Sequence, residues 1–412
     1  MAETERMSRA RFLTGMAAVG AAGALGSAGP AQAAERQGAA ERGSPGGRRA
    51  AERPRAGVRR RGVVYTVGEG ETPATGWNAR RMRADLRAIR DDLHADTVDV
   101  TGDGVERLTA TAAEAAELGL HIWLQPTLGD VPARDILEHL AETGRFAQRL
   151  RRQGASVDLG VGCEFWLFVP GIVPGDTALE RVRNLLRGAY DPVVLERRLA
   201  AFTARAARTG RSVFDGPLSY AAAQDDRVDW SLFDIVGIDY YSSFSRPADH
   251  VRELRRYQRF GKPVAVTEFG ACAYVGAPQA GGMAWDVVDH DKRPEEIKRG
   301  LIRSERTQAD HVTTLLDAFE ETGLYAAMAF EFVTPDAPHR ADDSRFDLDM
   351  ASYALTRTVH RRPGHPESGW HWEPKEAFDA VARHYARARC AAAAKVPLVP
   401  GRTRRRARRA GA

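Results

Sequence analysis

Two glutamates each stand at the end of a run of residues that is typical of a buried β-strand. Glu268 follows Val264 to Thr267 in KPVAVTEFGACAYVG, and Glu164 ends the glycine-rich run VDLGVGCE. A carboxylate at the end of a dry strand needs a reason, because an unpaired buried charge is costly. Two facing carboxylates can hydrolyse a glycosidic bond, since one protonates the leaving oxygen while the other acts as nucleophile or base. The alternative is that one or both glutamates are ordinary ion-paired strand ends.

The elements around these glutamates alternate regularly between strands and helices. We expect strands at 61–68, 96–102, 121–128, 157–168, 216–223, 233–244, 262–276 and 325–333. Helical spacing of apolar residues predicts helices at 78–93, 104–119, 133–153, 192–210, 248–261, 306–323 and 374–389. This alternation predicts a single (β/α)8 TIM barrel. The competing doubly wound sheet should carry a glycine-rich phosphate loop after its first strand, and YTVGEGETPATG lacks the required spacing.

In a TIM barrel the catalytic groups lie at the carboxyl ends of the strands, which is where both glutamates stand. Strand alternation places Glu164 on one face with Gly160 and Gly162. It likewise places Glu268 on one face with Val266. If both faces point inward, the two carboxylates meet at the mouth of the barrel. A separation of about 5–5.5 Å then means retention of anomeric configuration, and about 6.5–9.5 Å means inversion.

Four segments resemble the clan A retaining glycoside hydrolases, and in particular the family 113-like β-mannanases. They are GVGCEF, LSYAAA, VDWSLFDIVGIDYYSSF and KPVAVTEFGA, in an order that covers about 62–390. The resemblance implies Glu164 as general acid/base, Glu268 as nucleophile and a hydrogen bond from Tyr241 to that nucleophile. The chain also resembles actinobacterial proteins that are loosely named abortive (phage) infection proteins, a label that implies no chemistry.

Three positions depart from the pattern of these hydrolases. Cys163 stands where many of them have an asparagine that binds the sugar 2-hydroxyl. Asp99 and Thr101 end the second strand, where an arginine might support the nucleophile, and Phe332 replaces the usual sugar-stacking tryptophan. These departures leave two other functions open, a non-catalytic carbohydrate-binding barrel and a phage-defence or interaction protein on a glycosidase-like fold.

Further side chains near the expected mouth are candidates for binding a carbohydrate substrate. Aromatic rings stack on the faces of sugars, although in loops they also serve as structural anchors. With Tyr241, Cys163 and Phe332, the candidate set includes Tyr240, Asp239, Gln125, Trp166 and Trp285. The acidic segments DHD (289–291) and DLD (347–349) follow no recognised metal-ligand pattern. The predicted reaction requires no metal and no organic cofactor.

The two ends of the chain differ in composition from the part between them. Arginines before an apolar stretch and AQA at 31–33 predict an export signal at 1–33, by a twin-arginine-like or a general secretory route. The alternative is a disordered Ala/Gly-rich tail on a cytoplasmic protein. The apolar stretch is too weak for a membrane span. We expect a disordered basic linker at 34–61, the barrel at 62–392 and a basic tail at 393–412.

Excess positive charge is concentrated outside the expected barrel. The formal net charge of +5 comes with arginine-rich runs at 47–61 and 401–412, a pattern that favours solvated tails over a specific nucleic-acid site. The three cysteines, Cys163, Cys272 and Cys390, have the spacing of neither a zinc site nor a disulfide framework.

Overall fold

The structure is a computed structural model that describes residues 57–70, 72–224 and 226–393. The predicted export signal, most of the predicted linker and nearly all of the basic tail lie outside these ranges. The first strand begins at Arg60, two residues before the expected start of the barrel. Among the described residues, no helix is both long enough and apolar enough to cross a membrane.

Eight parallel strands close into a barrel, which confirms the predicted TIM-barrel fold. Around the barrel they follow the order β1-β10-β7-β6-β5-β4-β3-β2, and β1 closes the ring by pairing with both β10 and β2. The strands are β1 (Arg60–Val67), β2 (Thr97–Gly102), β3 (His121–Pro126), β4 (Val157–Cys163), β5 (Leu218–Ala223), β6 (Val236–Asp239), β7 (Val264–Phe269) and β10 (Ala326–Ala329).

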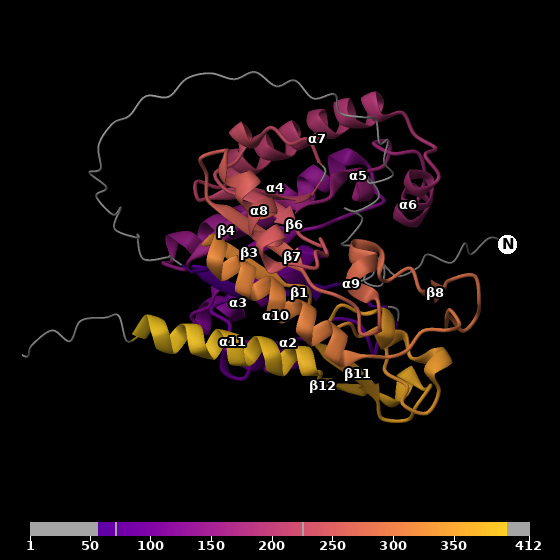
Figure 1. Ribbon diagram of the computed structural model, residues 1–412. Coiled ribbons are helices and arrows are strands. Elements are labelled where there is room, and N and C mark those ends of the chain that lie inside the picture. Colours follow the sequence, from indigo (N-terminus) through magenta and orange to yellow (C-terminus); the bar gives the residue numbers. More distant parts are fainter. Residues whose placement is uncertain (1–56, 71, 225, 394–412) are drawn as a thin grey trace, which may run out of the picture.

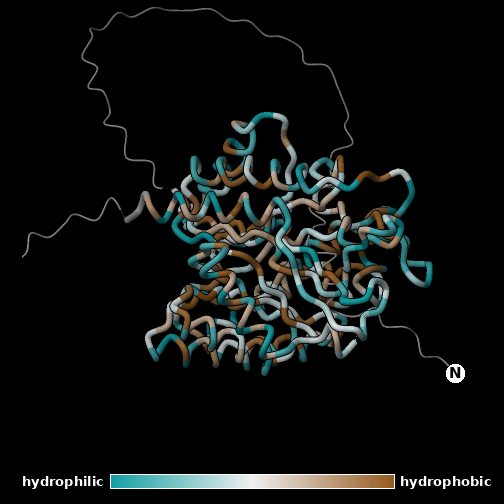
Figure 2. Tube along the Cα trace, turned by 90° about the horizontal axis from the view of Figure 1, so that it is seen from below, coloured by the Kyte–Doolittle hydropathy of each residue, from teal (hydrophilic) through white to brown (hydrophobic). Residues whose placement is uncertain are grey.

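Long helices cover the outside of the barrel (Figure 1). They are α2 (Ala79–Asp91), α3 (Val105–Glu117), α4 (Ala133–Arg152), α7 (Pro192–Val213), α8 (Pro247–Gln258), α10 (Glu305–Thr322) and α11 (Glu376–Ala393). Helix α2 illustrates why they form: Asn78 caps its first turn, and Met82, Leu86 and Ile89 are buried at helical spacing. Hydrophilic and hydrophobic residues alternate along such helices in Figure 2, as expected where one side faces the barrel and the other faces solvent. Between β5 and β6 the described chain forms only the short 3₁₀ helix η1 (Trp230–Leu232).

The loops at the carboxyl ends of the strands contain elements that the sequence did not predict. After β4 come α5 (Phe165–Phe168) and α6 (Ala178–Leu186). After β7 come α9 (Ala277–Ala280), η2 (Gly281–Met283) and a small hairpin of β8 (Val288–Asp289) and β9 (Glu296–Ile297). The last loop holds η3 (Ser344–Phe346), η4 (Leu348–Ala351), η5 (Pro366–Ser368) and the hairpin of β11 (Thr356–His360) and β12 (Trp370–Pro374).

Several predicted strands are longer than the observed ones. The sixth was expected at 233–244 and the eighth at 325–333, but β6 is Val236–Asp239 and β10 is Ala326–Ala329. The fourth was expected to reach residue 168, but β4 ends at Cys163 and Glu164 turns the chain into α5. The seventh ends at Phe269 rather than at residue 276. The fourth and seventh strands both end where the chain leaves the barrel, and most of the apolar residues beyond these points are buried in loops and a short helix, whereas Val275 is exposed.

The regular pairing of the strands is interrupted near their carboxyl ends. The register shifts between Gly160 and Cys163 on β4, and between Ile238 and Asp239 where β6 pairs with β7. Such irregularities re-aim side chains, because the strict alternation of faces stops there. They determine which residues reach the interior of the barrel mouth.

Candidate active site

Glu164 and Glu268 lie at the carboxyl ends of β4 and β7, and both are buried. Glu164 has left-handed backbone angles (φ 32°, ψ 60°), which are uncommon for a residue other than glycine. Its backbone N–H donates to the carbonyl of Ala221 on β5 across 2.9 Å, which anchors this turn. The turn explains how the consecutive residues Cys163 and Glu164 both interact with Asp239.

Each carboxylate oxygen of Glu268 lies within reach of a hydrogen-bond donor. The hydroxyl of Tyr241 donates to Oε2 across 3.0 Å, and the thiol of Cys163 lies 3.7 Å from Oε1. The same thiol lies 3.5 Å from Oδ2 of Asp239. Because a thiol has one proton, Cys163 donates to only one of these carboxylates at a time.

Asp239, at the end of β6, belongs to the same buried group. Its Oδ1 accepts a hydrogen bond from the hydroxyl of Thr267 across 2.7 Å. Thr267 and the next residue, Glu268, therefore both interact with groups at the end of β6, which strict strand alternation would not allow. The register shift between β6 and β7 accounts for this arrangement.

Burial dominates the electrostatics of four carboxyl groups: Asp99 on β2, Glu164, Asp239 and Glu268. It raises the pKa of Asp239 to about 8, although the hydrogen bonds from Thr267 and Cys163 act in the opposite direction. Burial first, and Asp239 next, raise the pKa of the other three well above their ordinary values. Asp226 adds to the effect on Glu164, while the hydrogen bond from Tyr241 opposes the effect on Glu268.

This group of four acids lacks a positive partner in the part of the chain that the structure describes. No lysine, arginine or histidine there forms an ion pair with any of them, and both carboxylate oxygens of Asp99 and of Glu164 have no hydrogen-bond partner. Several uncompensated charges so close together cannot coexist in a dry interior. The group therefore holds protons at neutral pH or binds something positive.

Three of the other predicted site residues also lie at or near the mouth of the barrel. Gln125 is buried at the end of β3, where its side-chain oxygen accepts a 3.4 Å hydrogen bond from the indole of Trp123. Trp166 is in α5, two residues after Glu164, and Trp285 is in the loop that follows β7. Both indole side chains are buried, so neither presents a ring face to solvent.

Two predicted site residues point elsewhere. The hydroxyl of Tyr240 pairs with His250 on α8 across 2.9 Å, and its ring packs edge-on against Phe319 on α10. Phe332 packs against Trp372 on β12, at 5.2 Å between ring centroids, and against Phe378 on α11. Both rings thus pack against elements outside the barrel, and their role in binding a substrate stays a prediction.

Sequence reasoning missed two acidic residues at the same end of the barrel. Glu331, just after β10, accepts hydrogen bonds from Thr66 and Thr334, and burial raises its pKa to about 8. Asp226, just after β5, lies near the hydroxyl of Tyr220 and raises the pKa of Glu164 and Asp239. The sequence signals were weak, because Glu331 lies inside the predicted strand 325–333 and Asp226 comes shortly after the predicted strand 216–223.

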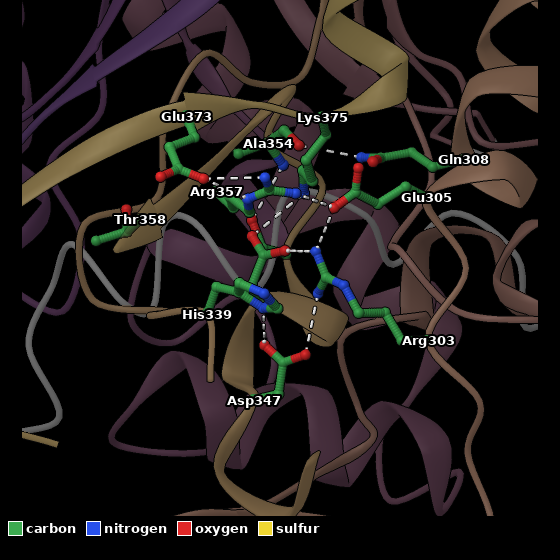
Figure 3. Close-up of polar contacts among 12 residues, drawn as sticks. Arg303, Glu305, Gln308, His339, Asp347, Ala354, Arg357, Thr358, Glu373 and Lys375 are labelled. Atoms are coloured by element: carbon green, nitrogen blue, oxygen red, sulfur yellow. Dashed lines mark hydrogen bonds and ion pairs between the residues drawn. The ribbon is translucent and has the colours of Figure 1, made fainter. Parts of the chain in front are cut away.

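A second acidic cluster, which includes the DLD segment, has a different character (Figure 3). His339 bonds to Asp347 across 2.9 Å, and Asp349 lies beside them. Arg303 pairs with both aspartates, at 3.1 Å and 2.8 Å, and the buried Lys375 pairs with Asp349. Its carboxylates are thus neutralised by side chains of the protein, which marks it as a structural network.

A pocket opens beside β1 and β12. Its walls include the rings of Trp77 and Trp370, the guanidinium-bearing Arg81 and the hydroxyl-bearing Thr66. Arg81 lies over the ring of Trp370, 3.8 Å from its centroid, and Thr66 connects the pocket to Glu331. Trp370 is buried and covered by Arg81, whereas Trp77 is half-buried, so Trp77 is the aromatic side chain that this pocket could offer to a sugar.

Comparison of the sequence with protein-family models and with curated proteins gives no match. The fold is similar to that of solved glycoside hydrolases. A GH113 β-mannanase from Alicyclobacillus acidocaldarius, in complex with ManMIm, is 16% identical with a TM-score of 0.50, covering 81% of this chain and 98% of its own. A GH113 β-1,4-mannanase is 14% identical with a TM-score of 0.51, covering 80% of this chain and 99% of its own. At such identities the likeness shows that the chain shares their barrel fold.

Proposed function

We propose that this protein is a retaining glycoside hydrolase, with Glu268 as nucleophile and Glu164 as general acid/base. One observation carries the proposal: two buried carboxyl groups end β4 and β7, and Tyr241 hydrogen-bonds one of them. The barrel alone would not support it, since this fold hosts many unrelated reactions.

The proposed reaction needs Glu164 protonated and Glu268 ionised, and burial raises the pKa of both carboxyl groups. Glu164, whose pKa is raised by burial, donates a proton to the leaving oxygen while Glu268 attacks the anomeric carbon. Glu164, now ionised, then takes a proton from water as that water attacks the anomeric carbon. The bond between this carbon and Glu268 breaks, which frees the Glu268 carboxylate and releases a sugar of retained configuration. The hydrogen bond from Tyr241 favours the ionised form of Glu268 that this attack requires.

Both glutamates are buried, so a substrate can reach them only if part of the covering structure moves. Tyr353 packs on the ring of Tyr241, with 5.4 Å between centroids. Its hydroxyl donates to the carbonyl of Gly281 across 2.7 Å and accepts from the amide of Ala284. Tyr353 therefore links the segment from Gly281 to Ala284 to Tyr241, which hydrogen-bonds Glu268. We propose that this segment moves to admit the sugar.

The burial of both glutamates also favours a second candidate, a non-catalytic carbohydrate-binding barrel. Glu164 is 0% exposed and Glu268 is 3% exposed. In that case a glycan would bind in the pocket beside Trp77 and Trp370, and the glutamates would only shape the interior.

Hydrolysis assays with matched variants distinguish the two candidates. The wild type, Glu268→Gln and Glu164→Gln would be tested on a panel of aryl glycosides and β-linked polysaccharides. Glu331→Gln serves as the control, because it also removes a buried carboxyl group at the end of a barrel strand. The hydrolase proposal expects turnover by the wild type and the control and loss of at least 10³-fold in the other two. Glycan binding without turnover, unaffected by Glu268→Gln, would support the binding barrel instead.

A further inference from the structure

Three side chains in the barrel mouth bring potential metal ligands close together. They are the sulfur of Cys163, a carboxylate oxygen of Asp239 and a carboxylate oxygen of Glu268. These three atoms lie within 4.8 Å of one another, and all three residues are buried. The sulfur is 3.5 Å from the nearer oxygen of Asp239 and 3.7 Å from that of Glu268.

These separations suit a tetrahedral divalent ion. Zinc binds a thiolate at about 2.3 Å and a carboxylate oxygen at about 2.0 Å, so a tetrahedral angle puts sulfur and oxygen about 3.5 Å apart. Only small side-chain movements are needed to place an ion between the three atoms. A thiolate among carboxylates favours zinc over magnesium or calcium, which prefer oxygen ligands.

Two further carboxyl groups independently indicate a missing positive charge. Asp99 and Glu164 are both 0% exposed, and neither of their carboxylates has a hydrogen-bond partner among the described residues. Both interact electrostatically with Asp239 and Glu268, so they face this group and not another part of the interior. Buried charges are normally paired or coordinate a metal.

The cluster of His339, Asp347 and Asp349 provides the internal comparison. There, Arg303 and Lys375 supply the positive charge, and an ion would have to compete with both. In the barrel mouth, no lysine or arginine of the described chain forms an ion pair with the carboxyl groups. Uncompensated carboxyl groups that a cation could neutralise are therefore found around Cys163 and not in the cluster of His339.

We propose that Cys163, Asp239 and Glu268 form a binding site for a thiophilic divalent cation of the zinc type, with Asp99 and Glu164 as nearby charge-balancing groups. Binding replaces the thiol proton of Cys163, which is released to solvent. The ion would occupy an oxygen of Glu268 that the proposed reaction needs, so it acts as a reversible inhibitor and not as a cofactor. The site itself does not depend on the proposed function.

The test measures binding of the metal alone to the full chain. After treatment with a chelator, Zn²⁺ would be titrated calorimetrically, and Co²⁺ would be added separately as a probe of thiolate ligation by its charge-transfer absorption. We expect one tight ion per chain and a cobalt–thiolate band. Affinity should fall at least tenfold in Cys163→Ser and in Asp239→Asn, since even outer-shell changes cost about 10–100-fold. Cys272→Ser is the matched control, because Cys272 is equally buried but lies near Tyr353 and Lys375.

Three results would overturn the proposal: no zinc binding by the wild type, no thiolate band with Co²⁺, or equal affinity in the wild type and Cys163→Ser. If Cys163→Ser fails to fold, the wild-type cobalt spectrum and Asp239→Asn still decide. Hydrolysis without zinc binding would contradict the zinc site and leave the proposed function standing. Zinc binding without hydrolysis would contradict the proposed function and leave the zinc site standing. Where both hold, Zn²⁺ should inhibit the wild type and a chelator should restore it.

Discussion

Tyr241 donates a hydrogen bond to Glu268 across 3.0 Å inside a closed barrel mouth. The adjacent residue, Tyr240, points the opposite way and pairs with His250 between the barrel and α8. Neighbouring tyrosines thus serve different purposes, one at the carboxyl groups and one in the outer packing layer. This pair offers a sharp test of the assigned roles.

Tyr241→Phe should lower kcat/KM by about 10–100-fold and move the acidic limb of its pH profile to higher pH. Loss of the hydrogen bond removes a donor that stabilises the carboxylate, so the pKa of Glu268 rises and the nucleophile ionises later. The pH dependence of hydrolysis measures both effects. Tyr240→Phe is the control and should leave the position of the limb unchanged; a shift in that variant would argue against a role specific to Tyr241.

Gly162→Ala should destabilise the protein by about 2–5 kcal/mol, from backbone strain together with overpacking. Gly162 has a φ of +143°, and an added Cβ would lie 2.4 Å from the ring of Phe165, which is stacked on Tyr220. Urea unfolding measures the loss. Gly154→Ala separates the two causes, because Gly154 also has a positive φ but its Cβ would meet nothing within 4 Å. Equal losses in the two variants would rule out the clash.

The sequence was sufficient to predict the barrel, because the periodicities of its strands and helices are local signals. Strand and helix periodicities predicted the eight-stranded order, and Glu164, Glu268 and Tyr241 follow recognisable strands. The sequence did not predict the direction of Tyr240 and Phe332, because that direction depends on how each strand ends, and the register shifts at the carboxyl ends leave no sequence signature.

The accumulation of buried acids was equally invisible in the sequence. Asp99 lies within β2 and Glu331 follows β10, and both are buried. The half-buried Asp226 follows β5. No local sequence pattern shows that these three acids come together. The sequence predicted that the fourth strand continues through Glu164. In the structure the chain makes a left-handed turn there, and Glu164 interacts with Asp239. Only tertiary structure reveals such convergence.

Glu331→Gln should reduce the dependence of stability on pH. The pKa of Glu331 is about 8 in the folded protein and near 4.5 when unfolded, so the folded state binds the extra proton between these values. Its contribution to the free energy of unfolding is thus full below about pH 4.5 and falls as the pH rises to about 8. Urea unfolding at pH 5 and pH 8 should show a smaller decline in Glu331→Gln than in the wild type. The exposed Glu138→Gln variant should decline like the wild type, and an equal decline in all three would contradict the assignment.

Arg303→Gln should lower the free energy of unfolding by about 3–5 kcal/mol, because it leaves two buried carboxylates without their guanidinium partner. Arg303 contacts Glu305, Asp347 and Asp349 within the network drawn in Figure 3. Chemical denaturation measures the effect. Arg134→Gln is the control. The side chain of Arg134 is 80% exposed, so the loss of its surface ion pairs should leave the free energy of unfolding almost unchanged. Similar stabilities of the two variants would show that the buried network contributes little.

The most direct test of the central claim is the reaction of Glu164→Ala with an activated aryl β-glycoside in the presence of azide. Azide needs no general base, so it can attack a glycosyl intermediate on Glu268 and restore turnover. We predict that turnover is restored and that the product is a β-glycosyl azide, whose configuration matches that of the substrate. An α-glycosyl azide, or undiminished hydrolysis by Glu268→Ala, would contradict Glu268 as the nucleophile.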